Sequence, residues 1–357
     1  MPKPTKICYI IPEYNKDVQG HFYHHYELLK ELSKKLDIFL IAETGNKKEK
    51  AEIKNIHIQK FKFLPLRIIE SLILILKARK RGYNIFYTHY SYIGAINAAI
   101  VSKLFKGTSY YWNCAMNWLF RQKTGKRIGY ILSLKWSDYL VTGSKKMKEE
   151  YASHYKLKKE KIKILPNWIN LERFEPSSKK EITNKILFIH WLSKRKGADM
   201  IIPIIIKLKD LIDDFQITVI GEGPYKNSLE QEIKEKNLEK YIKIIGGVPN
   251  KEISEYYDQN DILIMPSMEE GFPRVLLEAM AKQIPYVAFN VGAVNEISPG
   301  PARKLLVKPG DIDKFAYNIE TILTNKELYK EFKKSEKEQV KKYDIKKVAE
   351  KFIRKIK

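Results

Sequence analysis

The chain has 357 residues, 44% of them hydrophobic, and it carries 66 Lys and Arg against 42 Asp and Glu, for a formal charge of +24. This composition excludes disorder throughout the chain, and the length predicts two domains that each bury a core. Two cysteines cannot form a disulfide framework. The sequence contains no run of about 18 apolar residues, so we expect no membrane-spanning helix. The N-terminal residues are not typical of a signal peptide, so we expect a cytoplasmic protein.

In the first half of the chain, short apolar runs alternate with segments of helical periodicity. Helical segments are predicted at 22–36 and 93–105. Strands are predicted over residues 6–11, 37–43, 83–90, 109–114, 139–144 and 163–167. This alternation is typical of a parallel sheet that is covered by helices on both faces.

The composition changes at 166–185, which contains Pro166, Pro176 and two serines. The pattern then restarts, with strands at 185–192, 216–221, 242–247, 261–267 and 285–289 and helices at 197–212, 227–238, 251–259 and 273–283. Pro203 predicts a kink in the first of these helices, or a later start.

The two patterns predict two doubly wound, Rossmann-like α/β domains with a ligand-binding cleft between them, because ligands bind such sheets at the carboxyl ends of the strands. The predicted domains are an N-terminal domain at 1–174, a linker at 175–185, a second domain at 186–340 and a basic C-terminal helix at 341–357.

The positive charge is concentrated in the first half. Residues 1–180 carry 35 basic and 15 acidic side chains, whereas residues 181–357 carry 31 and 27. Between Glu70 and Asp138 there are eleven Lys and Arg and no acidic residue. A lysine-rich proteome would explain lysine everywhere but not this gap, so the asymmetry favours an anionic partner such as a membrane surface, nucleic acid or a phosphorylated substrate.

Two segments, 64–86 and 110–136, place basic clusters beside apolar and aromatic side chains. This pattern is typical of shallow docking onto anionic lipid, and the alternative for 68–76 is an ordinary core helix. We therefore expect a peripheral protein on the inner face of the cell membrane. Basic residues with aromatics also suit single-stranded nucleic acid, but no nucleic-acid-binding motif is present, so we expect no nucleic acid partner.

The segment 265–281 carries the clearest chemical pattern. A predicted strand ends near Pro266, and Pro273 suits the first position of a helix whose start can bind a diphosphate. Glu270 lies in the loop and Glu278 in the helix, so the two carboxylates can accept hydroxyl hydrogen bonds from different parts of one ligand. A carboxylate that merely favours the helix dipole would not account for Glu278 within an apolar run.

With two glutamates separated by seven residues, in EGF followed by LEAMA (270–281), this segment resembles glycosyltransferase family 4. That family comprises retaining nucleotide-sugar transferases of GT-B fold. The segments SDYLVTGSKKMKEEY, KIKILPNWINLERFEP, VIGEGP and VKPGDIDKFAYNIETIL follow in the family's order, so the resemblance covers the whole chain. It implies an acceptor-binding first domain, a donor-binding second domain and a hexosyltransferase-like enzyme of cell-envelope polysaccharide or glycolipid synthesis.

The resemblance also implies roles for single residues. Glu270 would hold donor-sugar hydroxyls, and Lys196 would neutralise the diphosphate as it leaves, which stabilises charge in the transition state. The remaining donor-site residues would be Gly271 and Phe272 through their amides, Glu278 at the ribose, Gly221 in a close turn and Val248 against the base. Gly20 would lie near the reacting centre.

The chain departs from the family pattern at several places, including Gln19 in the glycine pair near the first strand and residues 167–170 of the linker, and two of the departures concern the expected site. His190 and Trp191 stand where the family has glycine and arginine, so one cation for the diphosphate is missing, and Arg195 is either its substitute or a solvated charge. Trp112 and Asn113 stand where many members have a histidine near the sugar. These departures leave a catalytically impaired sugar-nucleotide-binding protein as the alternative function.

Further candidates come from residue placement. His21 follows Gly20 at a predicted helix start, and His89 ends a predicted strand, so both are candidates for the acceptor side. Asp311 and Asp313 mimic a metal-binding DxD, but an Asp between Pro-Gly and a helix is more often an N-cap. We expect no metal and no cofactor, with a nucleotide-sugar donor and a glycan or lipid-linked acceptor as partners.

Overall fold

A computed structural model describes residues 4–15, 23–45, 53–120, 123–177 and 181–356. The chain divides into two compact units, residues Met1–Pro166 with Ile345–Lys357, and Asn167–Asp344. The division follows Pro166 and therefore precedes the linker expected at 175–185. Two hydrogen bonds fasten the segment after it to the second unit, from Asn167 Nδ2 to the Phe272 carbonyl at 3.0 Å and from Arg274 to the Trp168 carbonyl at 2.6 Å.

Within the described residues, the first unit is built on a seven-stranded sheet of order β3-β2-β1-β4-β5-β6-β7, in which all neighbouring strands are parallel. The strands are β1 (Thr5–Tyr14), β2 (Leu36–Gly45), β3 (Asn55–Ile58), β4 (Ile85–His89), β5 (Thr108–Trp112), β6 (Tyr139–Thr142) and β7 (Ile162–Ile164). Our sequence prediction missed β3, a four-residue edge strand that is half-buried and lacks a continuous apolar run.

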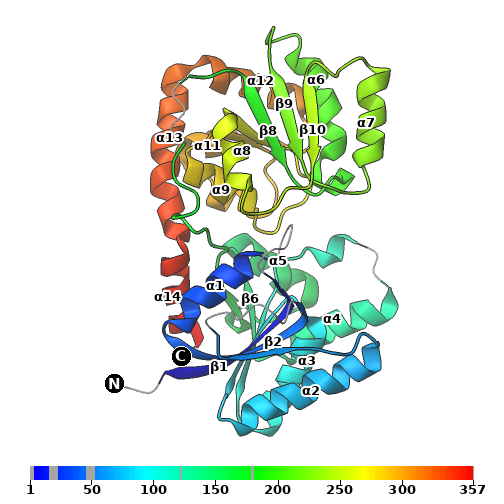
Figure 1. The fold of residues 1–357 in the computed structure, drawn as a ribbon, viewed down its shortest axis with the longest axis vertical. Coiled ribbons are helices and arrows are strands. Elements are labelled where there is room, and N and C mark those ends of the chain that lie inside the picture. The colour runs from blue at the N-terminus through cyan, green and yellow to red at the C-terminus, as the bar shows by residue number, and fades with distance from the viewer. Residues whose placement is uncertain (1–3, 16–22, 46–52, 121–122, 178–180, 357) are drawn as a thin grey trace. The chain divides into compact units, whose positions relative to one another are not determined.

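Helices of the first unit connect these strands (Figure 1). They are α1 (Tyr23–Ser33), α2 (Leu64–Lys80), α3 (Tyr92–Leu104), α4 (Thr124–Trp136) and α5 (Lys145–Tyr155), with short 3-10 turns η1 (Asn117–Leu119) and η2 (Lys159–Lys161). The Ser91 and Ser144 side chains cap α3 and α5 by accepting from backbone N–H groups.

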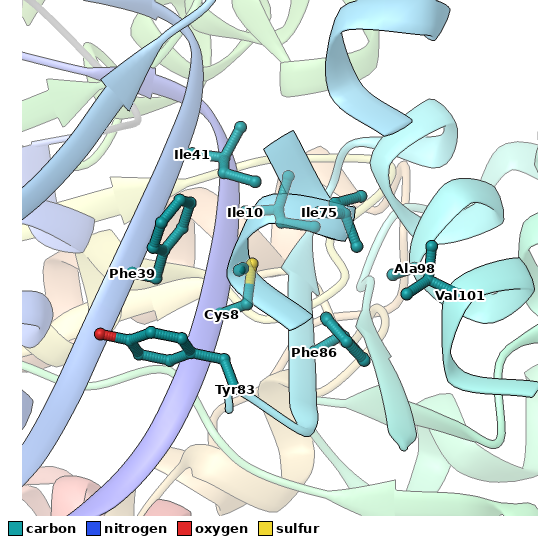
Figure 2. Packing of buried hydrophobic residues seen from close by; sticks show 10 residues of the cluster. Cys8, Ile10, Phe39, Ile41, Ile75, Tyr83, Phe86, Ala98 and Val101 are labelled. Carbon is teal, nitrogen blue, oxygen red and sulfur yellow. The ribbon is translucent and has the colours of Figure 1, made fainter. Parts of the chain in front are cut away.

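One face of the first sheet packs against α2 and α3 (Figure 2). Alternate residues of a strand point to opposite faces, so Cys8 and Ile10 of β1 contribute to this cluster while Tyr9 faces the other way. The rest of the cluster is Phe39, Ile41, Ile75, Ala78, Tyr83, Phe86, Ala98 and Val101. Parallel strands covered in this way read as apolar runs, which is why the sequence located most of them.

The C-terminal helix α14 (Ile345–Ile356) belongs to the first unit although 178 residues of the second unit precede it. Its Phe352 ring lies 6.1 Å from that of Tyr9 and 4.6 Å from that of Tyr87. The Tyr110 hydroxyl and the Lys163 ammonium donate to the Lys355 carbonyl at 3.4 and 3.1 Å. The helix also packs beside α1, so it covers the face of the sheet that Tyr9 occupies.

In the described residues of the second unit, a five-stranded parallel sheet has the order β10-β9-β8-β11-β12. Its strands are β8 (Lys185–Ile189), β9 (Gln216–Ile220), β10 (Ile242–Gly246), β11 (Ile262–Met265) and β12 (Tyr286–Ala288). Its helices are α6 (Ile201–Leu208), α7 (Lys226–Glu235), α8 (Ile253–Gln259), α9 (Arg274–Lys282), α10 (Val294–Ile297), α11 (Gly300–Lys304), α12 (Ile312–Thr324) and α13 (Lys326–Val340). The 3-10 turns are η3 (Lys194–Lys196), η4 (Ala198–Met200) and η5 (Lys341–Tyr343).

Prolines lie at or next to the start of α6 and of α9, the two helices of this unit for which the sequence raised an expectation. The helix that contains Pro203 begins late, at Ile201, which places the proline in its first turn where no intrahelical N–H is required. Pro273 is the residue before α9 rather than its first residue, so our expectation was wrong by one position.

None of the helices in the described part of the chain is long and apolar enough to cross a membrane.

Candidate active site

The carboxyl ends of β8 and β11 bring a group of charged side chains together in the second unit. The two strands pair in parallel, so the segments that leave them start at the same edge of the sheet. His190 follows β8 directly, Lys196 ends η3, and Glu270 lies in the loop between β11 and α9. Of these, the sequence analysis assigned Lys196 and Glu270 to the site.

Glu270 is the centre of this group, with a side chain that is 6% exposed. Its Oε1 accepts from Lys196 Nζ at 2.7 Å and lies 2.8 Å from His190 Nε2. Lys196 Nζ also donates to the Glu269 carbonyl at 3.1 Å. The ammonium is thus fixed both to the carboxylate and to the backbone of the same loop.

These contacts decide the charge states at the site. Burial alone would raise the pKa of the Glu270 carboxyl. The charges of Lys196 and of His190, which is protonated in the acid range where Glu270 would titrate, and the hydrogen bonds from both side chains outweigh burial and hold that pKa well below its usual range. Burial and the nearby Lys196 charge lower the pKa of His190. At neutral pH these shifts leave Glu270 as a carboxylate and His190 as a neutral imidazole.

Glu269 and Arg195 form a second, looser pair beside this group. Arg195 Nη1 lies 3.6 Å from Glu269 Oε1, and the arginine side chain is 42% exposed. Burial raises the pKa of the Glu269 carboxyl, although Arg195 and Lys196 act against this. Arg195 therefore lies next to the expected diphosphate cation Lys196 but engages a carboxylate.

The loop before α9 also contributes backbone amide groups to the site. The amide N–H groups of Gly271 and Phe272 have no protein acceptor among the described residues. The Phe272 ring is buried and packs edge-on against Tyr343 at 5.8 Å. Gly292, at φ +51°, lets the backbone after β12 approach the Glu270 carbonyl, which a Cβ at that position would meet.

Glu278 is buried in α9 and has its own partners. Tyr257 of α8 donates its hydroxyl to Glu278 Oε2 at 3.1 Å, and Arg274 lies 4.0 Å from Oε1. Burial and the Glu278 charge raise the pKa of Tyr257 well above its ordinary value, so the phenol keeps the proton that it donates. The carboxylate expected to hold a ribose is thus oriented by a tyrosine that sequence reasoning did not find.

The turns after β9 and β10 form the neighbouring part of the sheet edge. Gly221 has φ +144°, and a Cβ there would meet the His190 carbonyl, so only glycine allows this close approach. Val248 is half-buried in the loop after β10. That loop is tied to the turn after β9 because the Gly247 amide donates to Glu222 Oε1 at 3.0 Å.

In the first unit, the predicted residues at strand ends have buried side chains. His89 ends β4, stacks on Trp112 at 4.0 Å and lies edge-on to His25 at 3.9 Å. Trp112 Nε1 donates to the Leu165 carbonyl at 3.3 Å.

Asn113 belongs to a buried tyrosine network, in which it donates to Tyr111 and accepts from Tyr151 at 2.9 Å. In this arrangement Trp112 and Asn113 support neighbouring residues of the first unit. Gly20 and His21, the other two candidates on this side, lie outside the described residues.

Asp311 caps α12, since its carboxylate accepts from the Lys314 N–H at 3.0 Å. Asp313 pairs with Lys207 at 2.7 Å. The N-cap interpretation is confirmed for Asp311. Among the residues that the structure describes, no three His, Cys, Asp or Glu side chains gather as a metal site would require.

Sequence reasoning noted His190 only as a departure from the family pattern and missed its bond to Glu270. A polar residue at the carboxyl end of a predicted buried strand was the available signal. No comparable signal existed for Tyr257, because its contact with Glu278 depends on how α8 packs against α9.

Two family models match this chain. The model for "Glycosyltransferase Family 4" matches residues 18–173, and the model for "Glycosyl transferases group 1" matches residues 170–339.

Among curated proteins, 2-deoxystreptamine N-acetyl-D-glucosaminyltransferase of Niallia circulans is 31% identical over 140 residues, which is 39% of this chain and 36% of that protein. The phosphatidylinositol N-acetylglucosaminyltransferase GPI3 subunit of Saccharomyces cerevisiae is 28% identical over 45% of this chain and 38% of its own length. The matched region thus spans well under half of each of these relatives.

Among solved structures, HepE of Anabaena in complex with UDP and glucose superposes with a TM-score of 0.80 at 16% identity, covering 99% of both chains. The likeness extends over both parallel-sheet units and shows that they have the GT-B fold.

Proposed function

Since the two family models together span residues 18–339, the chain belongs to the family 4 glycosyltransferases, and we propose that it moves a sugar from a nucleotide-sugar donor to a glycan or lipid-linked acceptor. The reaction would be hexosyltransferase-like, would retain the anomeric configuration and would use no metal. Its place would be cell-envelope polysaccharide or glycolipid synthesis.

One observation carries this proposal: the buried group of Glu270, Lys196 and the amides of Gly271 and Phe272 after β8 and β11. A carboxylate held ionised suits sugar hydroxyls, which donate hydrogen bonds to it. A buried lysine amino group, and amides to which no described residue offers an acceptor, suit a diphosphate. These are the two chemical parts of a nucleotide sugar.

The proposed reaction assigns a role to each group. The acceptor hydroxyl oxygen attacks the anomeric carbon on the face from which the diphosphate leaves, the bond from that carbon to the diphosphate oxygen breaks, and the hydroxyl proton passes to the diphosphate. Lys196 stabilises the charge that develops on the leaving oxygen. Glu270 holds the sugar, and Glu278 holds the ribose, with Val248 and Gly221 beside the nucleoside and Arg195 near the diphosphate.

A donor screen tests the proposal. We expect UDP-, GDP- or ADP-sugars to raise the melting temperature, and the donor that does so to be consumed with an acceptor lipid or glycan. NMR of the product should show the donor's anomeric configuration. Glu270→Ala and Lys196→Ala should abolish transfer while the fold, followed by circular dichroism, persists.

Near-normal transfer by both variants would overturn the site assignment. Donor binding without turnover would instead support the impaired sugar-nucleotide-binding protein, which Trp191 in place of a family arginine favours.

We also propose that the first unit works at the anionic inner face of the cell membrane, where a lipid-linked acceptor would lie. Helix α2 supports this. Only Ser71, Ile75 and Ala78 of its 17 residues are fully buried. Ile69 and Ile73 are 54% and 58% exposed, and with Leu66, Lys77 and Lys80 they repeat every three or four residues, so they form one outward stripe of apolar and basic side chains.

The single acidic residue of α2, Glu70, is hydrogen-bonded to the backbone of the segment before the helix. The Glu70 carboxylate accepts from the backbone amides of Lys60 and Phe61 at 3.0 and 3.2 Å. This bond fastens the segment before α2, in which Phe61 and Phe63 are also exposed. Each lysine near an anionic surface adds about 1 kcal/mol, so the stripe combines apolar insertion with attraction.

Vesicle sedimentation tests this part. The protein should bind vesicles of phosphatidylcholine and phosphatidylglycerol at low salt and release them at high salt, and it should ignore phosphatidylcholine alone. Ile69→Gln with Ile73→Gln should weaken binding, while Ile206→Gln, at an exposed isoleucine of α6, should not. Equal binding by all variants would contradict the assigned stripe. Preference for single-stranded nucleic acid over vesicles would favour that partner instead.

A further inference from the structure

The Glu270 carboxylate receives both of its protein donors on one oxygen. Lys196 Nζ and His190 Nε2 approach Oε1 at 2.7 and 2.8 Å. The other oxygen, Oε2, accepts no hydrogen bond from any described residue. The carboxylate is therefore half satisfied by the protein and presents a second oxygen in a fixed orientation.

The tautomer of His190 follows from its other ring nitrogen. The Trp191 amide N–H lies 2.9 Å from His190 Nδ1 and donates to it. An N–H can donate only to a nitrogen that carries no proton, so in the neutral ring the proton is on Nε2, which faces Glu270. The ring then donates to the carboxylate without adding a positive charge.

The backbone around His190 is held in place. The His190 amide donates to the Ile220 carbonyl at 3.0 Å, and the Leu192 amide donates to the Glu222 carbonyl at 2.8 Å. The close approach at Gly221 is part of the same arrangement. The imidazole therefore has a fixed base on the sheet edge from which to orient Glu270.

We propose that His190 is a positioning residue: as a neutral Nε2–H donor it fixes Glu270 so that Oε2 accepts a hydroxyl of the donor sugar. This rests on the proposed transferase function and extends it to a residue that replaces a glycine of the family pattern. At neutral pH Lys196 places a cationic group 2.7 Å from the carboxylate, and the neutral ring of His190 fixes the orientation of the carboxylate.

The charged groups around the His190 ring determine how donor affinity should depend on pH. Of these groups, Glu270 comes from the loop before α9, and Lys196 and Arg195 come from η3. Burial and the two cations lower its pKa, whereas Glu270 acts in the opposite direction. Protonation at Nδ1 would place an N–H against the Trp191 N–H and break that bond. Donor affinity should therefore be constant at neutral pH and fall in acid as the ring gains its second proton.

Two substitutions at His190 separate the effect of its hydrogen bond to Glu270 from the effect of its side-chain volume. His190→Gln keeps an N–H donor that does not titrate, and His190→Leu removes it. A hydrogen bond to a charged group is worth a factor of roughly ten to a hundred, so His190→Leu should raise the donor KM by about that factor. His190→Gln should stay within about threefold of the natural protein at neutral pH and should lose the acid limb of its pH profile.

His154→Gln is the matched control, because His154 Nε2 also contacts a glutamate, Glu150 at 3.2 Å, but on the exposed surface of α5. It should change neither KM nor the pH profile. Melting temperatures measured at each pH keep loss of folding apart from loss of binding. Nitrogen-15 NMR of the histidine rings reports the tautomer without any turnover.

The proposal is overturned if the NMR signal of His190 shows the neutral proton on Nδ1, or if His190→Gln loses as much donor affinity as His190→Leu. Failure of the proposed function looks different: the natural protein would bind and turn over no nucleotide sugar, while the Nε2–H tautomer and its bond to Glu270 would remain in the spectrum.

Discussion

Two buried carboxylates of the second unit have opposite surroundings. Glu270, after β11, is bonded by Lys196 and His190, and its pKa lies well below the usual range. Glu336, in α13, is fully buried with no hydrogen-bond partner for either oxygen among the described residues, and burial raises its pKa well above the usual value. Depth of burial is similar, so the donors alone decide whether the carboxyl is charged.

The difference also gives the two residues opposite effects on stability with pH. Above the ordinary carboxyl pKa, the unfolded chain loses a proton from Glu336 that the folded chain keeps, so this group makes folding less favourable as pH rises. Below that pKa, the unfolded chain gains a proton on Glu270 that the folded chain lacks, so this group lowers stability as pH falls. A charged buried carboxylate is thus maintained at the site, and a neutral one is tolerated away from it.

The largest effect should come from removing the cation beside Glu270. Lys196→Met removes the cation from a buried carboxylate and leaves it only the hydrogen bond from His190, which should cost about 3–5 kcal/mol of the free energy of unfolding. Transfer should fall by at least about a hundredfold, because the leaving diphosphate loses its buried cation. Urea denaturation and donor turnover measure the two effects.

The double variant Lys196→Met with Glu270→Gln should recover most of the stability but none of the transfer. Lys194→Met, in the same turn but exposed, serves as the control and should alter the unfolding free energy little. If the double variant is as unstable as the single one, the Lys196–Glu270 pair is not the source of the loss.

Replacing the unpartnered carboxyl should have the opposite sign. Glu336→Met removes a buried polar group at similar volume and should stabilise the protein by about 1–3 kcal/mol at neutral pH. Because the penalty of Glu336 grows above the ordinary carboxyl pKa, the difference in melting temperature between variant and natural protein should increase from pH 4 to pH 8. Glu327→Met, on the exposed surface of the same helix, should show no such pH dependence.

Glu278 is an intermediate case, with one hydroxyl donor and a distant arginine. Tyr257→Phe removes the bond to Glu278 Oε2 and should lower the unfolding free energy by about 1–3 kcal/mol. If Glu278 binds the ribose, the affinity for a nucleoside diphosphate, measured by calorimetry, should also fall. An unchanged affinity would show that Tyr257 does not orient a ligand-binding group.

The smallest effect is expected at Asp311, an exposed carboxylate whose partner is a backbone amide. Asp311→Ala should cost about 1 kcal/mol as a lost N-cap, and Asp311→Asn should cost less. Manganese should not change the melting temperature of either form. A manganese-dependent shift in the natural protein that Asp311→Ala abolishes would revive the DxD interpretation.

Much of the fold was predictable from sequence because buried parallel strands are continuous apolar runs. The runs at 6–11 and 261–267 marked β1 and β11, and the strand prediction failed at β3, where pairing to β2 at the sheet edge decides the conformation. The aliphatic residues of α2 were ambiguous for a related reason. Composition alone does not show that Ile75 points into the core while Ile73 points outward.

At the site, the sequence by itself determined the local pattern: Glu270 before a helix, Glu278 within it, and Lys196 after a strand. It also determined the charge asymmetry between the two halves. These features depend only on residue order and spacing.

Only the tertiary structure decided which donors reach each carboxylate. His190 meets Glu270 across 80 positions of sequence because β8 and β11 pair side by side. The packing of α13 buries Glu336 where no described residue bonds to its carboxyl oxygens. The same is true of α14, which joins the first unit through Phe352. Contacts between distant segments set the local dielectric and the hydrogen bonds, and these fix whether a carboxyl is charged.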